Sequence, residues 1–179
     1  MKEKEIISNI REKLGIECLN DMQREMLDSI NEPGDLVLLS PTGSGKPLAF
    51  IARMLKELKA PNGKLQAVII APSRELVIQI FGIVRAIATG HKVTCCYGGH
   101  SVADERQSLS VVPSIIVSTP GRLLDHINRE HINVFTTRLL VLDEFDKSLE
   151  LGFHDEMKRI LRRMPNISRR TLTSATMID

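Results

Sequence analysis

Hydrophobic residues along the chain follow two alternating patterns. Helical spacing predicts two helices near the N-terminus, over residues 2–14 and from Asp21 onward. After these, short runs rich in β-branched residues predict strands, and stretches with helical spacing lie between them. The predicted strands cover residues 36–39, 67–71, 92–96, 114–118, 139–142 and 171–173. The predicted helices between and after them cover residues 48–55, 74–88, 102–109, 123–128 and 157–164.

This alternation predicts an α/β fold with a parallel sheet covered by helices on both faces. Continuously hydrophobic strands are typical of such a sheet, because neither face meets water. Proteins of this class bind ligands at the carboxyl ends of their strands. Polar motifs follow the strands that end at Leu39, Ala71, Ser118, Leu142 and Thr173. We therefore expect one functional site along that edge.

The motif after the first strand is a glycine-rich turn, Ser40-Pro41-Thr42-Gly43-Ser44-Gly45-Lys46-Pro47. A strand before it and a helix after it are the context of a phosphate-binding loop. Gly43 and Gly45 let backbone N–H groups approach a phosphate closely, and the helix adds its positive end. Lys46 supplies a cation for the outer phosphates. A glycine-rich turn without a ligand is the alternative.

Pro47 departs from the phosphate-loop pattern, which has Ser or Thr here to ligate magnesium through its hydroxyl. Proline has neither that hydroxyl nor a backbone N–H. Losing one charge-assisted hydrogen bond costs about 1.5–3 kcal/mol, or roughly ten- to a hundredfold in affinity. Proline suits the first turn of a helix, although it disfavours helical angles at Lys46. We expect weakened, magnesium-insensitive nucleotide binding.

Other polar motifs follow the later strands. Asp143-Glu144 could hold magnesium through water and activate an attacking water, or Asp143 could cap a helix. Three further motifs, each of which alone would indicate only a turn, a cap or an ion pair, are Arg74-Glu75, Thr119-Pro120-Gly121-Arg122 and Ser174-Ala175-Thr176. Together the motifs surround one edge of the sheet.

Composition and charge limit the possible functions and binding modes further. The chain has 179 residues, a net charge of +2, five Phe, one Tyr and no Trp. One domain is expected, and aromatic base stacking is disfavoured. Three free cysteines, an N-terminus unlike a signal peptide and no membrane-length apolar run predict a cytoplasmic protein. The five histidines show no ligand spacing. A basic cluster could touch phosphates or be a solvated face; it comprises Arg159, Arg162, Arg163, Arg169 and Arg170.

The ordered motifs resemble those of the amino-terminal RecA-like domain of DEAD-box ATP-dependent RNA helicases, a P-loop NTPase fold. The resemblance extends from Gln23 to Thr176. It includes the phosphate loop, Pro72-Ser73-Arg74-Glu75-Leu76, the doublet Gly98-Gly99, Thr119-Pro120-Gly121-Arg122, Asp143-Glu144-Phe145-Asp146 and Ser174-Ala175-Thr176. It implies one RecA-like ATP-binding domain over residues 1–179, with adenine-recognition helices in residues 1–34 and the family's second RecA-like domain absent.

The resemblance also implies ATP and Mg²⁺ as cofactors and RNA as a partner bound through its backbone. Gln23 would read adenine, and the phosphates would be held by Pro41, Thr42, Gly43, Ser44, Gly45, Lys46 and Pro47. Catalysis would involve Lys46, Asp143, which also positions the metal, and Glu144. RNA would be bound by Pro72, Arg74, Glu75, Gly98, Gly99, Thr119, Pro120, Gly121 and Arg122. Asp146, Ser174 and Thr176 would couple the two sites.

Several positions differ from the family pattern. Ile6 replaces the aromatic residue that usually stacks on adenine, Leu19-Asn20 replaces Pro-Thr, and Phe145 replaces Ala. Together with Pro47, these differences leave two functions open. One is the nucleotide-binding half of an RNA helicase, which alone would neither unwind RNA nor turn over ATP at a useful rate. The other is a scaffold or RNA-binding module that kept the fold and lost the ATPase. A third alternative is a DNA translocase, which is disfavoured because the residues of the motifs match those of the RNA helicases.

Overall fold

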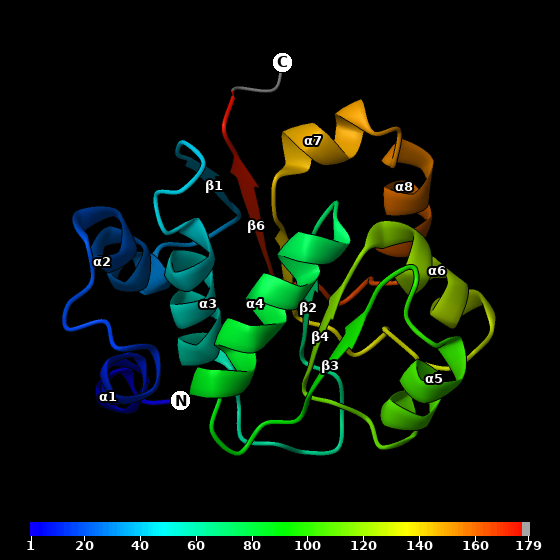
Figure 1. Cartoon of the computed structure of the whole chain (residues 1–179), viewed down its shortest axis with the longest axis horizontal. Helices are drawn as coiled ribbons and strands as arrows, with labels where there is room; N and C mark the ends of the chain where they lie inside the picture. The colour runs from blue at the N-terminus through cyan, green and yellow to red at the C-terminus, as the bar shows by residue number, and fades with distance from the viewer. Residues whose placement is uncertain (177–179) are drawn as a thin grey trace.

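The computed structural model describes residues 1–176, which form a parallel sheet between two groups of helices (Figure 1). The strands are β1 (Leu36–Leu39), β2 (Ala67–Ile70), β3 (Val93–Cys96), β4 (Ile115–Ser118), β5 (Leu139–Leu142) and β6 (Arg169–Ser174). Their order is β1-β6-β5-β2-β4-β3, and every neighbouring pair is parallel. The predicted fold class is confirmed.

Eight α-helices and one 3₁₀ turn accompany the sheet in the described residues. They are α1 (Glu3–Leu14), α2 (Asp21–Asp28), the 3₁₀ turn η1 (Ser29–Asn31), α3 (Lys46–Glu57), α4 (Arg74–Ile87), α5 (Val102–Ser110), α6 (Pro120–Asn128), α7 (Phe145–Glu150) and α8 (His154–Arg162). None of these helices is long and apolar enough to cross a membrane.

Each face of the sheet has its own hydrophobic core, because successive strand residues point to opposite sides. Within β2, Ile69 joins the core formed with α1, α2, α3 and α4. Its neighbours Val68 and Ile70 join the core formed with α5, α6 and α8. Both cores are closed by buried aliphatic side chains, so the two helix layers hold the strand ends in fixed positions.

The N-terminal segment is fastened to the first of these layers. The amino group of Met1 donates to the carbonyl oxygen of Leu55 at 2.9 Å. Glu3 forms ion pairs with Lys56 at 2.5 Å and with Arg24 at 2.6 Å. Ile6 is fully buried in the core. Residues 1–34 therefore pack on the sheet's helical layer beside the phosphate loop.

Three details differ from the sequence-based expectations. Helix α3 begins at Lys46, so Pro47 does not keep Lys46 out of the helix; Pro47 lies in the first turn, where no intrahelical partner is lost. Helix α6 begins at Pro120 for the same reason, earlier than expected. The chain after β5 forms two helices, α7 and α8, separated at Gly152, which has a φ of 82°.

The basic cluster predicted from the sequence is divided. Arg169 lies on β6, pairs with Glu57 at 2.7 Å and donates to the carbonyl oxygen of Ile30 at 3.2 Å. Arg170 contacts Asp35 at 3.4 Å. The remaining three arginines are on or next to α8. Arg169 and Arg170 therefore fasten the start of β1 to β6.

Candidate functional site

The phosphate loop connects β1 to α3 at the carboxyl edge of the sheet. Gly43 and Gly45 have φ angles of 82° and 85°, which other residues rarely adopt. A Cβ atom on Gly45 would lie 2.5 Å from Nε2 of Gln23. The backbone angles of Gly45 therefore favour glycine, and any larger residue there would also displace the end of the Gln23 side chain.

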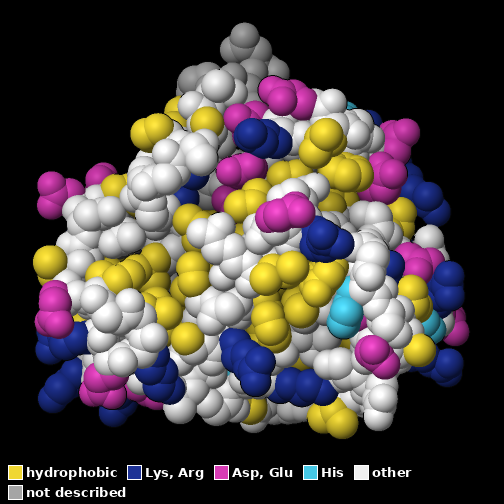
Figure 2. Space-filling model, in the orientation of Figure 1, with side chains coloured by type: hydrophobic (Ala, Val, Ile, Leu, Met, Phe, Trp, Pro, Cys, Tyr) yellow, Lys and Arg dark blue, Asp and Glu magenta, His cyan; other side chains and the backbone are white. Residues whose placement is uncertain are grey.

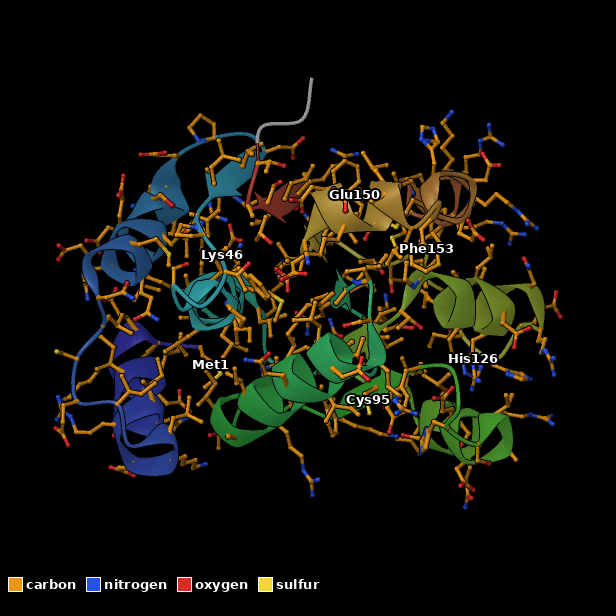
Figure 3. The ribbon with its side chains drawn as sticks, turned by 45° about the horizontal axis from the view of Figure 1, so that its top comes forward. Met1, Lys46, Cys95, His126, Glu150 and Phe153 are labelled. Atoms are coloured by element: carbon orange, nitrogen blue, oxygen red, sulfur yellow. The ribbon has the colours of Figure 1, made fainter. Side chains whose placement is uncertain are left out.

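Lys46 opens α3 and is buried, with 4% of its surface exposed. Figure 3 shows it at the end of α3 that faces the loop. Its Nζ donates to the carbonyl oxygen of Ser40 at 2.7 Å. The Ser44 hydroxyl donates to the carbonyl oxygen of Pro41 at 2.7 Å, and its oxygen lies 2.6 Å from that of Ser40. The loop thus closes on itself through its own polar groups.

Gln23 lies against this loop. Asn20 and Gln23 form a reciprocal cap: each side-chain oxygen accepts the other's backbone N–H at 2.9 Å. The Gln23 amide also donates to the carbonyl oxygen of Gly45 at 3.2 Å, and the Asn20 amide donates to that of Ser44 at 3.1 Å. One cap therefore joins α2 to the phosphate loop.

Asp143 and Glu144 follow β5, next to the end of β6. Asp143 has 2% of its surface exposed, and burial raises the pKa of its carboxyl group. The hydroxyl of Thr173 donates to Asp143, which opposes this rise, as does the nearby charge of Lys46. Thr173 also accepts the backbone N–H of Glu144 at 3.0 Å. Glu144 has a φ of 47°, an uncommon backbone conformation that changes the direction of the chain between β5 and α7.

These residues allow a test of whether magnesium fits the site. Pro47 offers no oxygen where the pattern has a hydroxyl. Asp143 supplies one buried carboxylate, already ordered by Thr173. Magnesium usually keeps several waters and takes few protein ligands. The residues therefore fit a magnesium ion held with phosphate, water and Asp143, but with one ligand fewer than usual.

Asp146 joins α7 to the segment after β6. Its Oδ2 accepts the hydroxyl of Thr176 at 3.2 Å and the backbone N–H of Ala175 at 3.4 Å. Burial alone would raise its pKa, but hydrogen bonds from the backbone N–H groups of Lys147 and Ala175 and from Thr176 outweigh it and lower the pKa. Ser174 is buried, and its hydroxyl donates to the carbonyl oxygen of Thr176 at 2.6 Å.

A hollow of about 360 Å³ lies along the same edge, beyond β2 and β4. It is called the second hollow, because the phosphate loop is the first proposed site on this edge. Its lining comprises Pro72, Arg74, Gly98, Thr119, Gly121, Arg122, Asp125 and Phe153. Gly99 adjoins it, since a Cβ there would lie 3.2 Å from Nη1 of Arg74. Glu75 is exposed and lies 3.9 Å from Arg74, and Pro120 is buried in the first turn of α6. The structure thus brings six of the nine predicted RNA-binding residues around one hollow.

Three residues of this edge were not singled out by the sequence. Thr173 donates a hydrogen bond to Asp143. Phe153, in the turn between α7 and α8 (Figure 3), lines the second hollow. Glu105 is buried and contacts Arg122 of the same hollow. Glu105 carried a detectable signal, because it shares the inner face of α5 with Leu109 four residues later. A carboxylate on a hydrophobic helix face predicts a buried partner.

Charge is mixed over the surface. In Figure 2, Lys and Arg lie among Asp and Glu around the visible face, and no single basic patch dominates it. This agrees with the net charge of +2. Any anionic ligand must therefore be recognised by specific hydrogen bonds rather than by a strong overall field.

Known proteins share both the sequence and this arrangement. The profile of the DEAD/DEAH box helicase family matches residues 20–179. The ATP-dependent RNA helicase has1 of Emericella nidulans is 36% identical over 92% of this chain and 28% of its own length. The ATP-dependent RNA helicase CshA of Listeria monocytogenes is 37% identical over 93% of this chain and 32% of its own. This chain thus spans about a third of these relatives.

Solved structures agree. A DEAD box protein from the hyperthermophile Methanococcus jannaschii superposes with a TM-score of 0.88 at 32% identity, over 97% of this chain and 48% of that one. A hypothetical ATP-dependent RNA helicase from Sulfolobus tokodaii gives a TM-score of 0.87 at 29% identity, over 99% and 52%. These matches identify the sheet and its helices as a RecA-like domain. The chain belongs to the DEAD/DEAH box helicase family.

Proposed function

We propose that this chain is the nucleotide-binding domain of an ATP-dependent RNA helicase and couples ATP binding to RNA binding. The observation that carries the proposal is the meeting of two motifs at one sheet edge. Lys46 lies at the start of α3 and Asp143 directly after β5, and the charge of Lys46 partly opposes the rise that burial causes in the pKa of Asp143. A cation for phosphate and an acid for a metal therefore face one site.

Each residue of the phosphate loop has a distinct role in this proposal. Backbone N–H groups around Gly43 and Gly45 and the positive end of α3 bind the phosphates. Lys46 exchanges its bond to the Ser40 carbonyl for the outer phosphates. Gln23 and Asn20 hold the loop from the side of α2, and Gln23 is proposed to read the adenine edge.

Magnesium, when bound, would neutralise phosphate charge between the loop and Asp143. Asp143 is ordered for this by Thr173, and the same hydroxyl fixes the backbone of Glu144. Glu144 is the residue positioned to orient and polarise the attacking water. Proline at position 47 removes one N–H and one hydroxyl from this arrangement and weakens it.

RNA is proposed to bind along the second hollow. The groups there are glycine backbone, Thr119 and the guanidinium groups of Arg74 and Arg122. Such groups contact phosphate and ribose and carry little base information. Asp146, which accepts the hydroxyl of Thr176 in the segment after β6, is proposed to couple the nucleotide site to this region. Unwinding and ATP turnover are proposed only for a protein that also contains a second RecA-like domain.

A second candidate is an RNA-binding scaffold that no longer uses ATP. Two observations favour it. Pro47 lacks the metal-ligating hydroxyl, and Ile6 is fully buried in the core, where it cannot stack on a base. The two candidates differ in one measurable property, since only the helicase domain binds a nucleotide.

The test is a pair of titrations on the 179-residue chain and on Lys46→Ala. Fluorescent ADP should bind the unsubstituted chain, and Lys46→Ala should reduce its affinity at least about tenfold, because a charge-assisted contact is lost. A labelled single-stranded uridine oligonucleotide should bind both proteins alike. RNA binding without detectable ADP binding would instead identify the scaffold. Absence of RNA binding would overturn both candidates.

A further inference from the structure

Glu105 is a charged residue in the interior, on the inner face of α5. Its side chain has no exposed surface. A carboxylate in such a place is tolerated only when it is paired and hydrogen-bonded, so its partners indicate what it does. All of them belong to the glycine doublet loop after β3 or to α6, which border the second hollow.

Four donors surround the carboxylate. Oε2 accepts the backbone N–H of Tyr97 at 3.0 Å and lies 2.9 Å from Nδ1 of His100. Oε1 accepts Nη1 of Arg122 at 3.0 Å and lies 2.7 Å from Nε2 of His126. Burial alone would raise the pKa of Glu105, but these hydrogen bonds outweigh it and lower the pKa. Glu105 is therefore ionised at neutral pH.

The arrangement ties Arg122 to the glycine doublet loop. Nη1 of Arg122 donates both to Glu105 and to the carbonyl oxygen of His100, each at 3.0 Å. The Arg122 side chain is only 14% exposed. One side of its guanidinium group is thus occupied by the protein, while the residue still lines the hollow beside Gly98.

His126 is the fourth partner of Glu105. Figure 3 shows it on α6, toward α5. Its Nδ1 lies 2.9 Å from Nδ1 of His131, and its Nε2 faces Glu105. If Nε2–H donates to the carboxylate, the neutral ring accepts the Nδ1–H of His131. This chain of hydrogen bonds supplies a donor to Glu105 without adding a second buried charge.

The same place is not suited to a metal ion. Cys96, Glu105 and His126 each have a ligand atom within 4.8 Å of the others. Burial, with the neighbouring charge of Glu105, strongly raises the pKa of the Cys96 thiol, whereas a metal requires the thiolate. A metal would also have to displace Arg122 from a carboxylate whose two oxygens already have four partners. The cluster therefore favours a structural brace.

We propose that Glu105 is the positioning residue of the RNA-binding face, which holds Arg122 and the loop of Tyr97 to His100 in one arrangement before RNA binds. This inference rests on the proposed function. A prearranged surface binds more tightly because less conformational entropy is lost on association. Glu105 itself is buried and does not touch the RNA.

The test is the substitution Glu105→Gln, which keeps the volume but removes the charge. Removing a negative charge near an RNA site should strengthen binding if only long-range electrostatics acts. If Glu105 holds Arg122 in place, the substitution should instead weaken binding of a uridine oligonucleotide about tenfold, because one charge-assisted hydrogen bond is lost. Fluorescence anisotropy measures this affinity. ADP affinity should not change. The matched control is Asp104→Asn, an exposed acid beside it on α5, which should not weaken RNA binding.

Two further measurements separate the outcomes. Hydrogen exchange without RNA should become faster at Tyr97 and in the loop up to His100 in Glu105→Gln, and unchanged exchange there would overturn the brace. Arg122→Lys keeps the charge but cannot bridge Glu105 and His100 in the same way. It should weaken RNA binding, and the double variant should lose less than the sum of the two single effects. This second variant also serves if Glu105→Gln does not fold.

The remaining outcomes are equally decisive. RNA binding by the unsubstituted chain that neither Glu105→Gln nor Arg122→Lys weakens would overturn this inference alone. Additive effects in the double variant would mean that Arg122 acts without Glu105, and would overturn it as well. No RNA binding by the unsubstituted chain would overturn the proposed function, and this inference with it.

Discussion

At the scale of single residues, the site is organised around buried polar groups that work in pairs. Lys46 and Asp143 are almost fully buried, at 4% and 2% exposure. Each has a hydrogen-bond partner, Ser40 for the amine and Thr173 for the acid. Burying such groups has an energetic cost that packing alone would not require. The burial of this amine and this acid is explained if they bind a ligand, as proposed for the nucleotide site.

Asp143 gives the first prediction. Because its folded-state pKa is raised above the unfolded value, the folded state holds the proton more tightly, and stability falls as pH rises through that range. Asp143→Asn should therefore stabilise the domain at neutral pH. A gain of about 1 kcal/mol would raise Tm by roughly 2–4 °C in a domain of this length. Below about pH 4, where an unfolded-state aspartate is protonated, the gain should disappear.

The measurement is thermal unfolding of both proteins across this pH range. Glu25→Gln, which neutralises an exposed acid on α2, is the control and should show no such gain. A destabilised Asp143→Asn at neutral pH would contradict the account, because it would mean that the ionised carboxylate contributes to the stability of the free domain.

At the scale of elements, the N-terminal helices act as a support for the phosphate loop. The cap formed by Asn20 and Gln23 both starts α2 and reaches the carbonyl groups of Ser44 and Gly45. A local capping interaction is thereby extended into a contact between two elements. The position of the loop consequently depends on a helix end that is distant from it in sequence.

Asn20→Ala tests this dependence. Loss of the cap should destabilise the domain by about 0.5–2 kcal/mol, and loss of the contact to Ser44 should also weaken ADP binding. Ser101→Ala removes the side-chain cap of α5, which lies away from the loop. It should reduce Tm by a similar amount without changing the ADP affinity measured by titration. Equal ADP affinity in all three proteins would disprove the supporting role of α2.

The sequence predicted most of these elements because their patterns are local. Continuous apolar runs predicted the strands to within one or two residues. Helix α7 was not predicted, because its six residues are too few to show a helical periodicity. The spacing of Glu105 and Leu109 indicates that Glu105 is buried, but its partners could not be predicted. They lie in the loop after β3 and on α6, and their meeting with α5 depends on how these elements pack.

At the scale of the whole molecule, one sheet edge carries both proposed sites. The nucleotide residues follow β1, β5 and β6, and the RNA residues follow β2, β3 and β4. The strand order places the first group in one half of the sheet and the second in the other. Asp143 on β5 adjoins β2, whose loop contributes Pro72 and Arg74. The two sites are therefore neighbours through the sheet itself.

RNA binding by this surface should depend on salt and not on base sequence. The few cationic groups in the hollow, Arg74 and Arg122, predict a shallow slope of log affinity against log salt, about −0.7 for each phosphate neutralised on a single strand. Anisotropy titrations with uridine and adenosine oligonucleotides at several salt concentrations measure both properties. A strong preference for one sequence would contradict a backbone-directed surface.

Pro47 is the position where the central claim can be tested most directly. Calorimetric titration of ADP and ATP, with and without magnesium, should be made on this chain and on Pro47→Thr. The account predicts weak, magnesium-insensitive binding to the unsubstituted chain. It predicts binding that is about ten- to a hundredfold tighter and magnesium-dependent for Pro47→Thr, which regains an N–H and a hydroxyl. Tight, magnesium-dependent ATP binding by the unsubstituted chain, equal to that of Pro47→Thr, would contradict it.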